Sequence, residues 1–231
     1  TGQADNTVVF FTCDNGTSPK ANFPQLDAAG VHLNANWRGW KADAYEGGHR
    51  VPFIVRWPGR IKPGTRSDET IVLTDIMASC AGILGTELSA NTAEDSVNLL
   101  PVLRGGKMEK PLHDVVVHHS GSGHFAIRKG QWKLLLCRGS GGWSPPREAE
   151  ATKQKLPMLQ LYDLASDPKE SKNLQAKYPD KVKELAADLA KAFRNGRTTP
   201  GPHQQNEGWP YTVPKPVLQK FPQLADPKIK P

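Results

Sequence analysis

The sequence has few cysteines and no long apolar run. Its three cysteines, Cys13, Cys80 and Cys137, have the spacing of neither a disulfide framework nor a metal-binding knuckle. We therefore interpret them as small apolar residues. No stretch approaches the roughly 18 consecutive apolar residues of a membrane helix, so we expect no membrane span.

Hydrophobic residues make up only 37% of the 231 residues, whereas glycine and proline are frequent, with 21 and 20 copies. This composition excludes a coiled coil and a helix-only protein, because both glycine and proline disfavour helix interiors. It favours a mixed fold with many loops.

Acidic residues are outnumbered by basic ones, 23 to 30, which gives a formal net charge of +7. A positive net charge favours anionic partners through long-range electrostatics. The basic residues are spread along the chain rather than gathered in one block, so we expect no nucleic acid partner. Sulfate or phosphate esters and anionic polysaccharides remain open as partners.

The first half of the chain combines strand and helix patterns. Residues 7–12 form a continuous apolar run, typical of a strand buried on both faces of a parallel sheet. A second strand is predicted within 51–59, a helix over 68–84 and a helical turn over 98–103. Residues 17–50 show no sustained period and are predicted to be a long loop.

The pattern changes near residue 110. Short strand candidates separated by glycines predict an antiparallel meander, and they span residues 114–118, 124–128, 131–137 and 160–164. Residues 179–194 predict an amphipathic helix, because apolar residues recur at steps of three and four. From residue 198 onward many prolines and no period predict a tail that either wraps on the body or stays loose.

These patterns predict an α/β fold in which a small antiparallel β-sheet with a C-terminal helix follows a sheet-and-helix core. The expected divisions are residues 1–110, 111–197 and a proline-rich tail over 198–231.

Asp14 and Asn15 directly follow the first strand, where open α/β sheets place ligands. A carboxylate beside an amide carbonyl supplies hard oxygen ligands that suit Ca²⁺ or Mg²⁺. The same pair can also form an Asx-turn by bonding local backbone N–H groups. Both interpretations are open from the dipeptide alone.

A second candidate segment contains Lys41 and the glycines of residues 45–52. A lysine is a compact point charge that can bind an anionic oxygen, and glycines let the backbone approach a ligand closely. The alternative is a basic surface loop with buried tryptophans. The pair His118-His119 is interpreted as structural rather than substrate-binding.

Taken in order, several segments resemble the formylglycine-dependent sulfatases of the arylsulfatase type, within the alkaline-phosphatase-like superfamily. The resemblance covers residues 1 to about 195. It is carried by NTVVFFTCDNG over 6–16, RGWKADAYEGGHRVPF over 38–53, WPG over 57–59, TDI over 74–76 and LYDL over 161–164.

The resemblance implies roles for three residues. Asp14 and Asn15 occupy the positions that bind a divalent metal, usually Ca²⁺, and Lys41 occupies the position that binds the sulfate group. It also implies hydrolysis of sulfate esters on a sulfated small molecule or polysaccharide, and a periplasmic or secreted location.

Other elements of the family pattern are missing. The chain contains no Cys/Ser-x-Pro-x-Arg motif, in which the nucleophile becomes formylglycine. The paired aspartates and the His and Lys that precede Asp14 in the family are absent as well. We therefore expect a C-terminal portion of a longer sulfatase, with little or no turnover by itself. The alternatives are a phosphodiesterase or phosphonate hydrolase of the same superfamily and a non-catalytic binder of sulfated polysaccharide.

Overall fold

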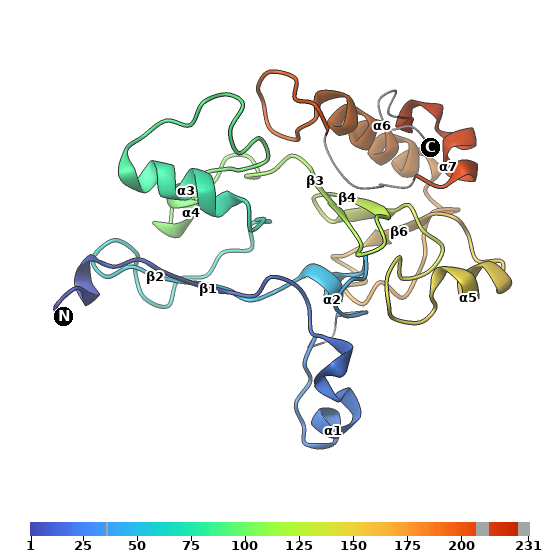
Figure 1. Cartoon of the computed structure of the whole chain (residues 1–231), viewed down its shortest axis with the longest axis horizontal. Helices are drawn as coiled ribbons and strands as arrows, with labels where there is room; N and C mark the ends of the chain where they lie inside the picture. The colour runs from blue at the N-terminus through green and yellow to red at the C-terminus, as the bar shows by residue number, and fades with distance from the viewer. Residues whose placement is uncertain (36, 207–212, 226–231) are drawn as a thin grey trace. The chain divides into compact units, whose positions relative to one another are not determined.

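The computed structural model describes residues 1–35, 37–206 and 213–225. The chain forms two compact units, each assembled from segments that are separate in the sequence (Figure 1). Unit 1 comprises Thr1–Cys13, Pro52–Asp114 and Asn195–Gln205. Unit 2 comprises Asp14–Val51, Val115–Arg194 and Asn206–Pro231. The division of the sequence at residue 110 stays a prediction.

Unit 1 begins with the short 3₁₀ helix η1 (Ala4–Asn6) and a two-stranded antiparallel ribbon of β1 (Val9–Thr12) and β2 (Phe53–Arg56). Both strands were predicted, but the expected parallel pairing and two-sided burial of the first are wrong. Phe11 lies opposite Ile54, and these side chains are 57% and 60% exposed. Among the described residues no further strand joins the ribbon, so one apolar face stays uncovered.

The helices of unit 1 are α3 (Asp75–Leu84) and α4 (Leu100–Leu103). The first starts seven residues later than the helix predicted from residue 68. The cause is Asp75, whose buried carboxylate accepts the Val72 N–H at 2.9 Å and thereby holds the preceding chain in a turn. The same carboxylate accepts hydrogen bonds from the Val97 N–H at 2.8 Å and from the ring of His113 at 2.9 Å.

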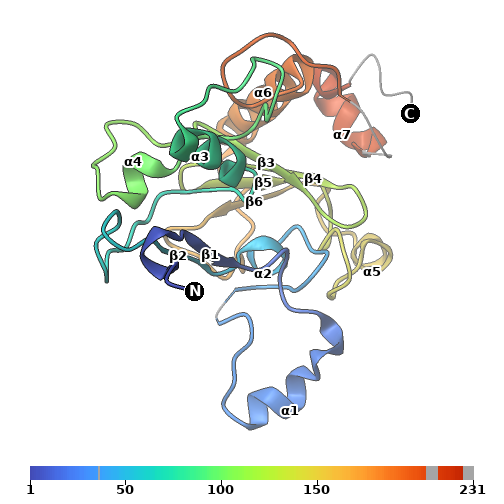
Figure 2. The ribbon, with the colours of Figure 1, turned by 60° about the vertical axis from the view of Figure 1, so that its left-hand side comes forward.

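Unit 2 is built on a four-stranded antiparallel sheet in the order β3-β4-β5-β6 (Figures 1 and 2). The strands are β3 (Val116–His119), β4 (Phe125–Lys129), β5 (Trp132–Leu135) and β6 (Gln160–Asp163). This is the meander predicted from the short apolar runs. The β4–β5 turn uses Gly130 with a φ of 56°, a conformation that glycine adopts without the strain a Cβ brings.

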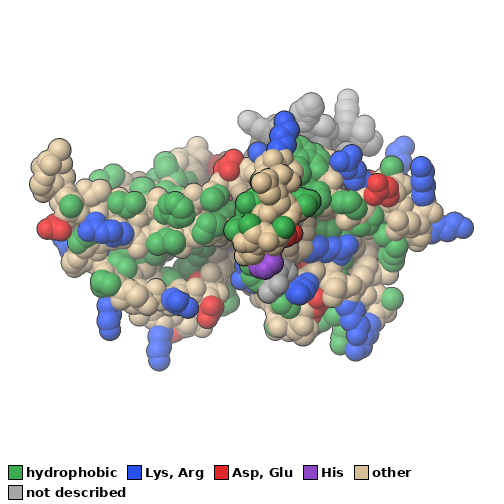
Figure 3. Space-filling view, turned by 90° about the horizontal axis from the view of Figure 1, so that it is seen from below, with side chains coloured by type: hydrophobic (Ala, Val, Ile, Leu, Met, Phe, Trp, Pro, Cys, Tyr) green, Lys and Arg blue, Asp and Glu red, His purple; other side chains and the backbone are tan. Residues whose placement is uncertain are grey.

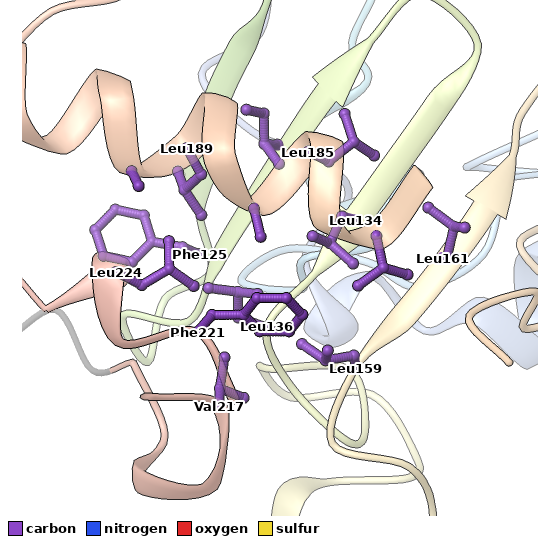
Figure 4. Close-up of a cluster of buried hydrophobic side chains, with 14 of the residues drawn as sticks. Phe125, Leu134, Leu136, Leu159, Leu161, Leu185, Leu189, Val217, Phe221 and Leu224 are labelled. Carbon is purple, nitrogen blue, oxygen red and sulfur yellow. The ribbon is translucent and has the colours of Figure 1, made fainter. Parts of the chain in front are cut away.

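One face of this sheet packs against α6 (Pro179–Asn195). Successive side chains of a strand point to opposite faces, so Ile127, Leu134 and Leu161 share the face that packs on α6. Figure 4 shows Leu134 and Leu161 together with Leu185 and Leu189 of that helix. The helix contributes its apolar stripe, including Leu185 and Leu189. This layer is the main hydrophobic core of unit 2.

The other face of the sheet carries Ala126, Leu135 and Tyr162. It is covered by Ala44 and Tyr45, which lead into the short helix α2 (Glu46–His49). Figures 1 and 2 both show α2 on the side of the sheet opposite to α6. The sheet is therefore a layer between the C-terminal helix and the segment that contains the candidate site.

The proline-rich tail packs on the core where the structure describes it. It forms α7 (Lys215–Lys220) and the 3₁₀ helix η3 (Pro222–Leu224). Val217, Phe221 and Leu224 are buried in the α6 layer (Figure 4). The sequence left open whether the tail packs on the body of the protein or stays loose. Residues 213–225 pack on it. The parts of the predicted tail at 207–212 and 226–231 lie outside the described residues.

Besides α2 and the helices of the tail, three further short helices among the described residues of unit 2 were not predicted. They are η2 (Pro19–Ala21) and α1 (Phe23–Ala28), within the segment expected to be a loop, and α5 (Glu148–Lys153). None is long enough to show helical periodicity in the sequence. Local hydrogen bonds define them instead, as where the Glu150 carboxylate accepts the Arg147 N–H at 3.0 Å and caps α5.

Charge is dispersed on the face of the molecule drawn in Figure 3. On the face drawn in Figure 3, Lys and Arg side chains stand singly or in small groups among apolar and polar ones. In the portion of the chain that the structure describes, no helix has the length and apolar character needed to cross a bilayer.

Replacing Leu134 by alanine tests the α6 layer. This fully buried residue leaves a cavity when truncated, so we expect the free energy of unfolding to fall by about 2–5 kcal/mol. The same change at Leu84, which is 78% exposed, should cost less than about 0.5 kcal/mol. Urea-induced unfolding followed by circular dichroism measures both, and equal losses would contradict the proposed layer.

Candidate functional site

The structure brings the two predicted site segments together through their backbones. The Gly16 N–H donates to the Gly48 carbonyl at 2.9 Å, and the Lys41 N–H donates to the Thr17 carbonyl at 3.0 Å. The loop that carries Asp14 and Asn15 is thus bonded to both the Lys41 turn and α2. All of these residues belong to unit 2.

Glycines make this close approach possible. A Cβ on Gly16 would overlap the Gly47 carbonyl, and a Cβ on Gly47 would overlap the Gly39 carbonyl. A Cβ on Gly48 would overlap the carbonyl of Asp43. The glycines of the 45–52 segment therefore serve contact between backbones here.

The side chains of the three candidate residues are left without protein partners. Asp14 is exposed, and Asn15 and Lys41 are half-buried. In the ranges that the structure covers, their carboxylate, amide and ammonium groups form no hydrogen bond or ion pair. A carboxylate and an amide oxygen are available to a cation, and an ammonium is available to an anion.

The donor chemistry at Asp14 and Asn15 fits Ca²⁺, which prefers oxygen ligands without competing partners. The two residues are a partial set, because Ca²⁺ takes about six to eight oxygens. Across the described residues no cluster of three or more His, Cys, Asp or Glu side chains has a metal-binding arrangement. The metal role of these residues stays a prediction.

A buried charge network next to the site was not predicted from the sequence. The Lys133 ammonium lies on the α2 side of β5, 2.9 Å from Glu46 Oε1 and 2.9 Å from Glu170 Oε1. All three side chains are almost completely buried. The only signal in the sequence is a lysine inside an apolar strand, and the sequence does not reveal its partners.

The network fixes the charge on Glu46. Burial by itself raises the pKa of this carboxyl, but the Lys133 ammonium, together with Arg128 and Arg50, outweighs it and lowers the pKa to about 2. Burial raises the pKa of Glu170, a shift that Lys133 opposes. Glu170 Oε2 also accepts the backbone N–H of Glu46 at 2.6 Å, so the network holds the first turn of α2 against the sheet.

Two histidines complete the network. His49 Nε2 lies 3.0 Å from Lys133 Nζ, so this ring nitrogen accepts a hydrogen bond from the ammonium. The His118 ring packs 4.0 Å from the His49 ring, and its Nε2–H donates to the Ala44 carbonyl at 3.3 Å. Burial lowers the pKa of His118 to about 3 and that of His49 well below its usual range. Burial therefore favours the neutral form of both rings.

Comparisons with known proteins place the chain in a family. Residues 1–86 match the family model described as sulfatase, and residues 111–225 match the model of the C-terminal region of aryl-sulfatase. The N-acetylgalactosamine-6-O-sulfatase of Bacteroides thetaiotaomicron is 35% identical over 187 residues, which cover 79% of this chain and 35% of that protein. The mouse steryl-sulfatase is 29% identical over 229 residues, which cover 88% of this chain and 35% of that protein.

A solved structure from work on glycosaminoglycan metabolism by Bacteroides thetaiotaomicron shares the fold with a TM-score of 0.67 and 33% identity. The match covers 82% of this chain and 39% of that one. The chain thus spans about a third of the length of the curated relatives above. It belongs to the sulfatase family, within the alkaline-phosphatase-like superfamily, and corresponds to the C-terminal portion of its members.

Replacing Lys133 by methionine tests the buried network. The change leaves the carboxylates of Glu46 and Glu170 buried without their shared ammonium, so we expect a loss of about 3–5 kcal/mol in the free energy of unfolding at pH 7. The same change at Lys181, which pairs with Glu184 at the surface, should cost no more than about 1 kcal/mol. Denaturant titration measures both. A loss at position 133 no larger than at 181 would show that the network does not hold unit 2.

The histidines predict how stability depends on pH. Below pH 6.5 the unfolded chain binds a proton at His118 that the folded chain excludes until about pH 3. The stabilisation from the neutral ring is complete above pH 6.5 and is lost as the pH falls, by at most about 1.4 kcal/mol per pH unit. His118→Gln should flatten the slope measured by urea unfolding between pH 7.5 and 5, whereas His203→Gln, at an exposed position, should leave it unchanged. An unchanged slope in His118→Gln would contradict the prediction.

Proposed function

We propose that this chain is part of a hydrolase that cleaves sulfate esters, with Asp14, Asn15 and Lys41 in its active site. Membership of the sulfatase family supports the reaction class. The observation that carries the site is the hydrogen bond between the Lys41 N–H and the Thr17 carbonyl, which joins the ammonium-bearing turn to the loop of Asp14 and Asn15. Among the described residues, none of these three side chains has a hydrogen-bond or ion-pair partner, which leaves them available to a ligand.

Lys41 has the chemistry to bind the sulfate group. Cleavage of a sulfate ester develops negative charge on the transferred group and on the leaving oxygen. Lys41 is a half-buried residue, and an ammonium held beside that group by the protein stabilises the charge more than the same cation in water. Lys41 therefore both orients the substrate and lowers the barrier.

Asp14 and Asn15 would hold Ca²⁺, and the metal would supply further positive charge for the sulfate oxygens. The two residues follow each other directly, so their oxygens can contribute to one side of a coordination shell. The remaining ligands and the formylglycine nucleophile belong to a longer enzyme in this proposal, because no Cys/Ser-x-Pro-x-Arg motif occurs in this sequence.

The proposed substrate class is a sulfated saccharide or another sulfated small molecule. The bacterial relative at 35% identity is named as an N-acetylgalactosamine-6-O-sulfatase, which supports a saccharide. The formal net charge of +7 favours the approach of such anions. A periplasmic or secreted location is part of the same proposal. No observation favours the phosphodiesterase or the non-catalytic alternative.

Lys41→Ala in the longer enzyme tests the proposed site. We expect kcat/KM for an aryl sulfate to fall about 10²–10³-fold, because a charge-stabilising donor is lost while the fold is retained. Lys20→Ala, at an exposed lysine of the same unit, should have no effect. Sulfate release measures both variants.

Unchanged kcat/KM in Lys41→Ala would contradict the role of Lys41. The isolated chain of 231 residues should release no sulfate in the same assay. Clear turnover by it would contradict the proposal that the nucleophile lies outside this sequence.

A further inference from the structure

The turn that carries Lys41 is held by a buried carboxylate two residues further along the chain. Asp43 is 3% exposed. Its Oδ2 accepts the Trp40 N–H at 2.9 Å, and its Oδ1 accepts the N–H groups of Trp143 at 2.8 Å and Ser144 at 3.0 Å. One carboxylate therefore bonds the residue before Lys41 to a loop that is distant in the sequence.

Two backbone hydrogen bonds strengthen this connection. The Gly121 N–H donates to the Ala42 carbonyl at 2.8 Å, and the Ala44 N–H donates to the Ser140 carbonyl at 2.8 Å. The residues on both sides of Asp43 are thus bonded to the loops that follow β3 and β5. The Lys41 N–H itself bonds to Thr17, so the turn is tied to three separate segments of unit 2.

Two glycines pack closely against the turn and its carboxylate. A Cβ on Gly142 would overlap the Ala42 carbonyl, and a Cβ on Gly39 would lie 2.6 Å from Asp43 Oδ2. Ala42 has a φ of 78°, which residues with a Cβ rarely adopt. Such a conformation persists only where the surrounding bonds impose it, and strained backbone of this kind is concentrated at functional sites.

We propose that Asp43 is the positioning residue for Lys41. A lysine side chain has a flexible four-carbon stem, so its ammonium is placed reproducibly only when the backbone beneath it is fixed. Asp43 fixes that backbone through the Trp40 N–H and anchors it to the Trp143–Ser144 loop. The carboxylate acts through Lys41 and does not itself contact the sulfate. This inference rests on the proposed function.

The experiment is a double-mutant cycle in the longer enzyme, with inorganic sulfate as the probe. Asp43→Asn keeps the size of the side chain but turns an N–H group toward a backbone N–H. We expect the inhibition constant for sulfate to rise at least tenfold and kcat/KM for an aryl sulfate to fall by a similar factor. In the Lys41→Ala background the same change should add less than twofold, because the group that Asp43 positions is already absent.

The matched control is Asp75→Asn. Asp75 is also a buried carboxylate that accepts two backbone N–H groups, but it belongs to unit 1 and makes no bond to the Lys41 turn. This variant should lose stability and keep the inhibition constant for sulfate. The control separates loss of a buried carboxylate in general from loss of the one that positions Lys41.

The outcomes are distinct. If Lys41→Ala leaves the inhibition constant unchanged, the proposed function fails. If Lys41→Ala weakens sulfate binding but Asp43→Asn does not, only the positioning role is overturned. An Asp43→Asn effect of equal size in both backgrounds also overturns it, since the residue would then act independently of Lys41.

A second variant keeps the test decisive if Asp43→Asn does not fold. Gly142→Ala retains the carboxylate but pushes its new Cβ against the Ala42 carbonyl. It should weaken sulfate binding in the wild-type background and have no further effect with Lys41→Ala. Unchanged sulfate binding in folded Gly142→Ala would overturn the inference.

Discussion

The contact between the Lys133 ammonium and the carboxylates of Glu46 and Glu170 is the interaction on which the candidate site depends. It lies on the face of the sheet opposite to α6, where a strand would otherwise present apolar side chains to the segment above it. A buried ammonium is tolerated only when carboxylates compensate the loss of its hydration. The sheet therefore accepts the 44–49 segment in one position, with Glu46 over Lys133.

This constraint reaches the candidate ligands through the backbone. Once α2 is held by Glu46, the Gly48 carbonyl is placed where the Gly16 N–H of the loop after β1 can bond to it. That loop carries Asp14 and Asn15, and Thr17 at its end bonds to Lys41. Within unit 2, hydrogen bonds and ion pairs therefore connect the sheet to α2, α2 to the loop of Asp14 and Asn15, and that loop to the turn of Lys41. The candidate functional groups extend from these segments, and within the described part of the chain their side chains form no hydrogen bond or ion pair.

An element of the fold could be predicted from the sequence when the interactions that define it lie within its own segment. The strands of the meander and α6 were predicted because apolar residues recur with the right period within each segment. The first residue of α3 was not predicted correctly, because it depends on a hydrogen bond to the Asp75 carboxylate and not on the spacing of apolar residues. The exposure of Phe11 was not predicted, since an apolar run indicates burial whether or not a neighbouring strand is present to cover it. The partners of Lys133 come from distant segments, so no local pattern identifies them.

The candidate site shows the same limit. From the dipeptide alone, Asp14 and Asn15 were compatible with an Asx-turn and with a metal site, and the turn was the favoured interpretation. Only the ordered resemblance to sulfatases separated these interpretations, and the family assignment supports that resemblance. Asp43 was not singled out at all, because a lone aspartate in a polar loop has no signature. Its three backbone donors are visible only in three dimensions.

The most direct measurement is a crystal structure of the longer enzyme with Ca²⁺ and a bound sulfate or selenate, located by anomalous scattering. The account predicts oxygens of Asp14 and Asn15 at about 2.3–2.6 Å from the metal. It also predicts the Lys41 ammonium within about 3 Å of an anion oxygen. An anion bound elsewhere, with Lys41 directed into solvent, would contradict it.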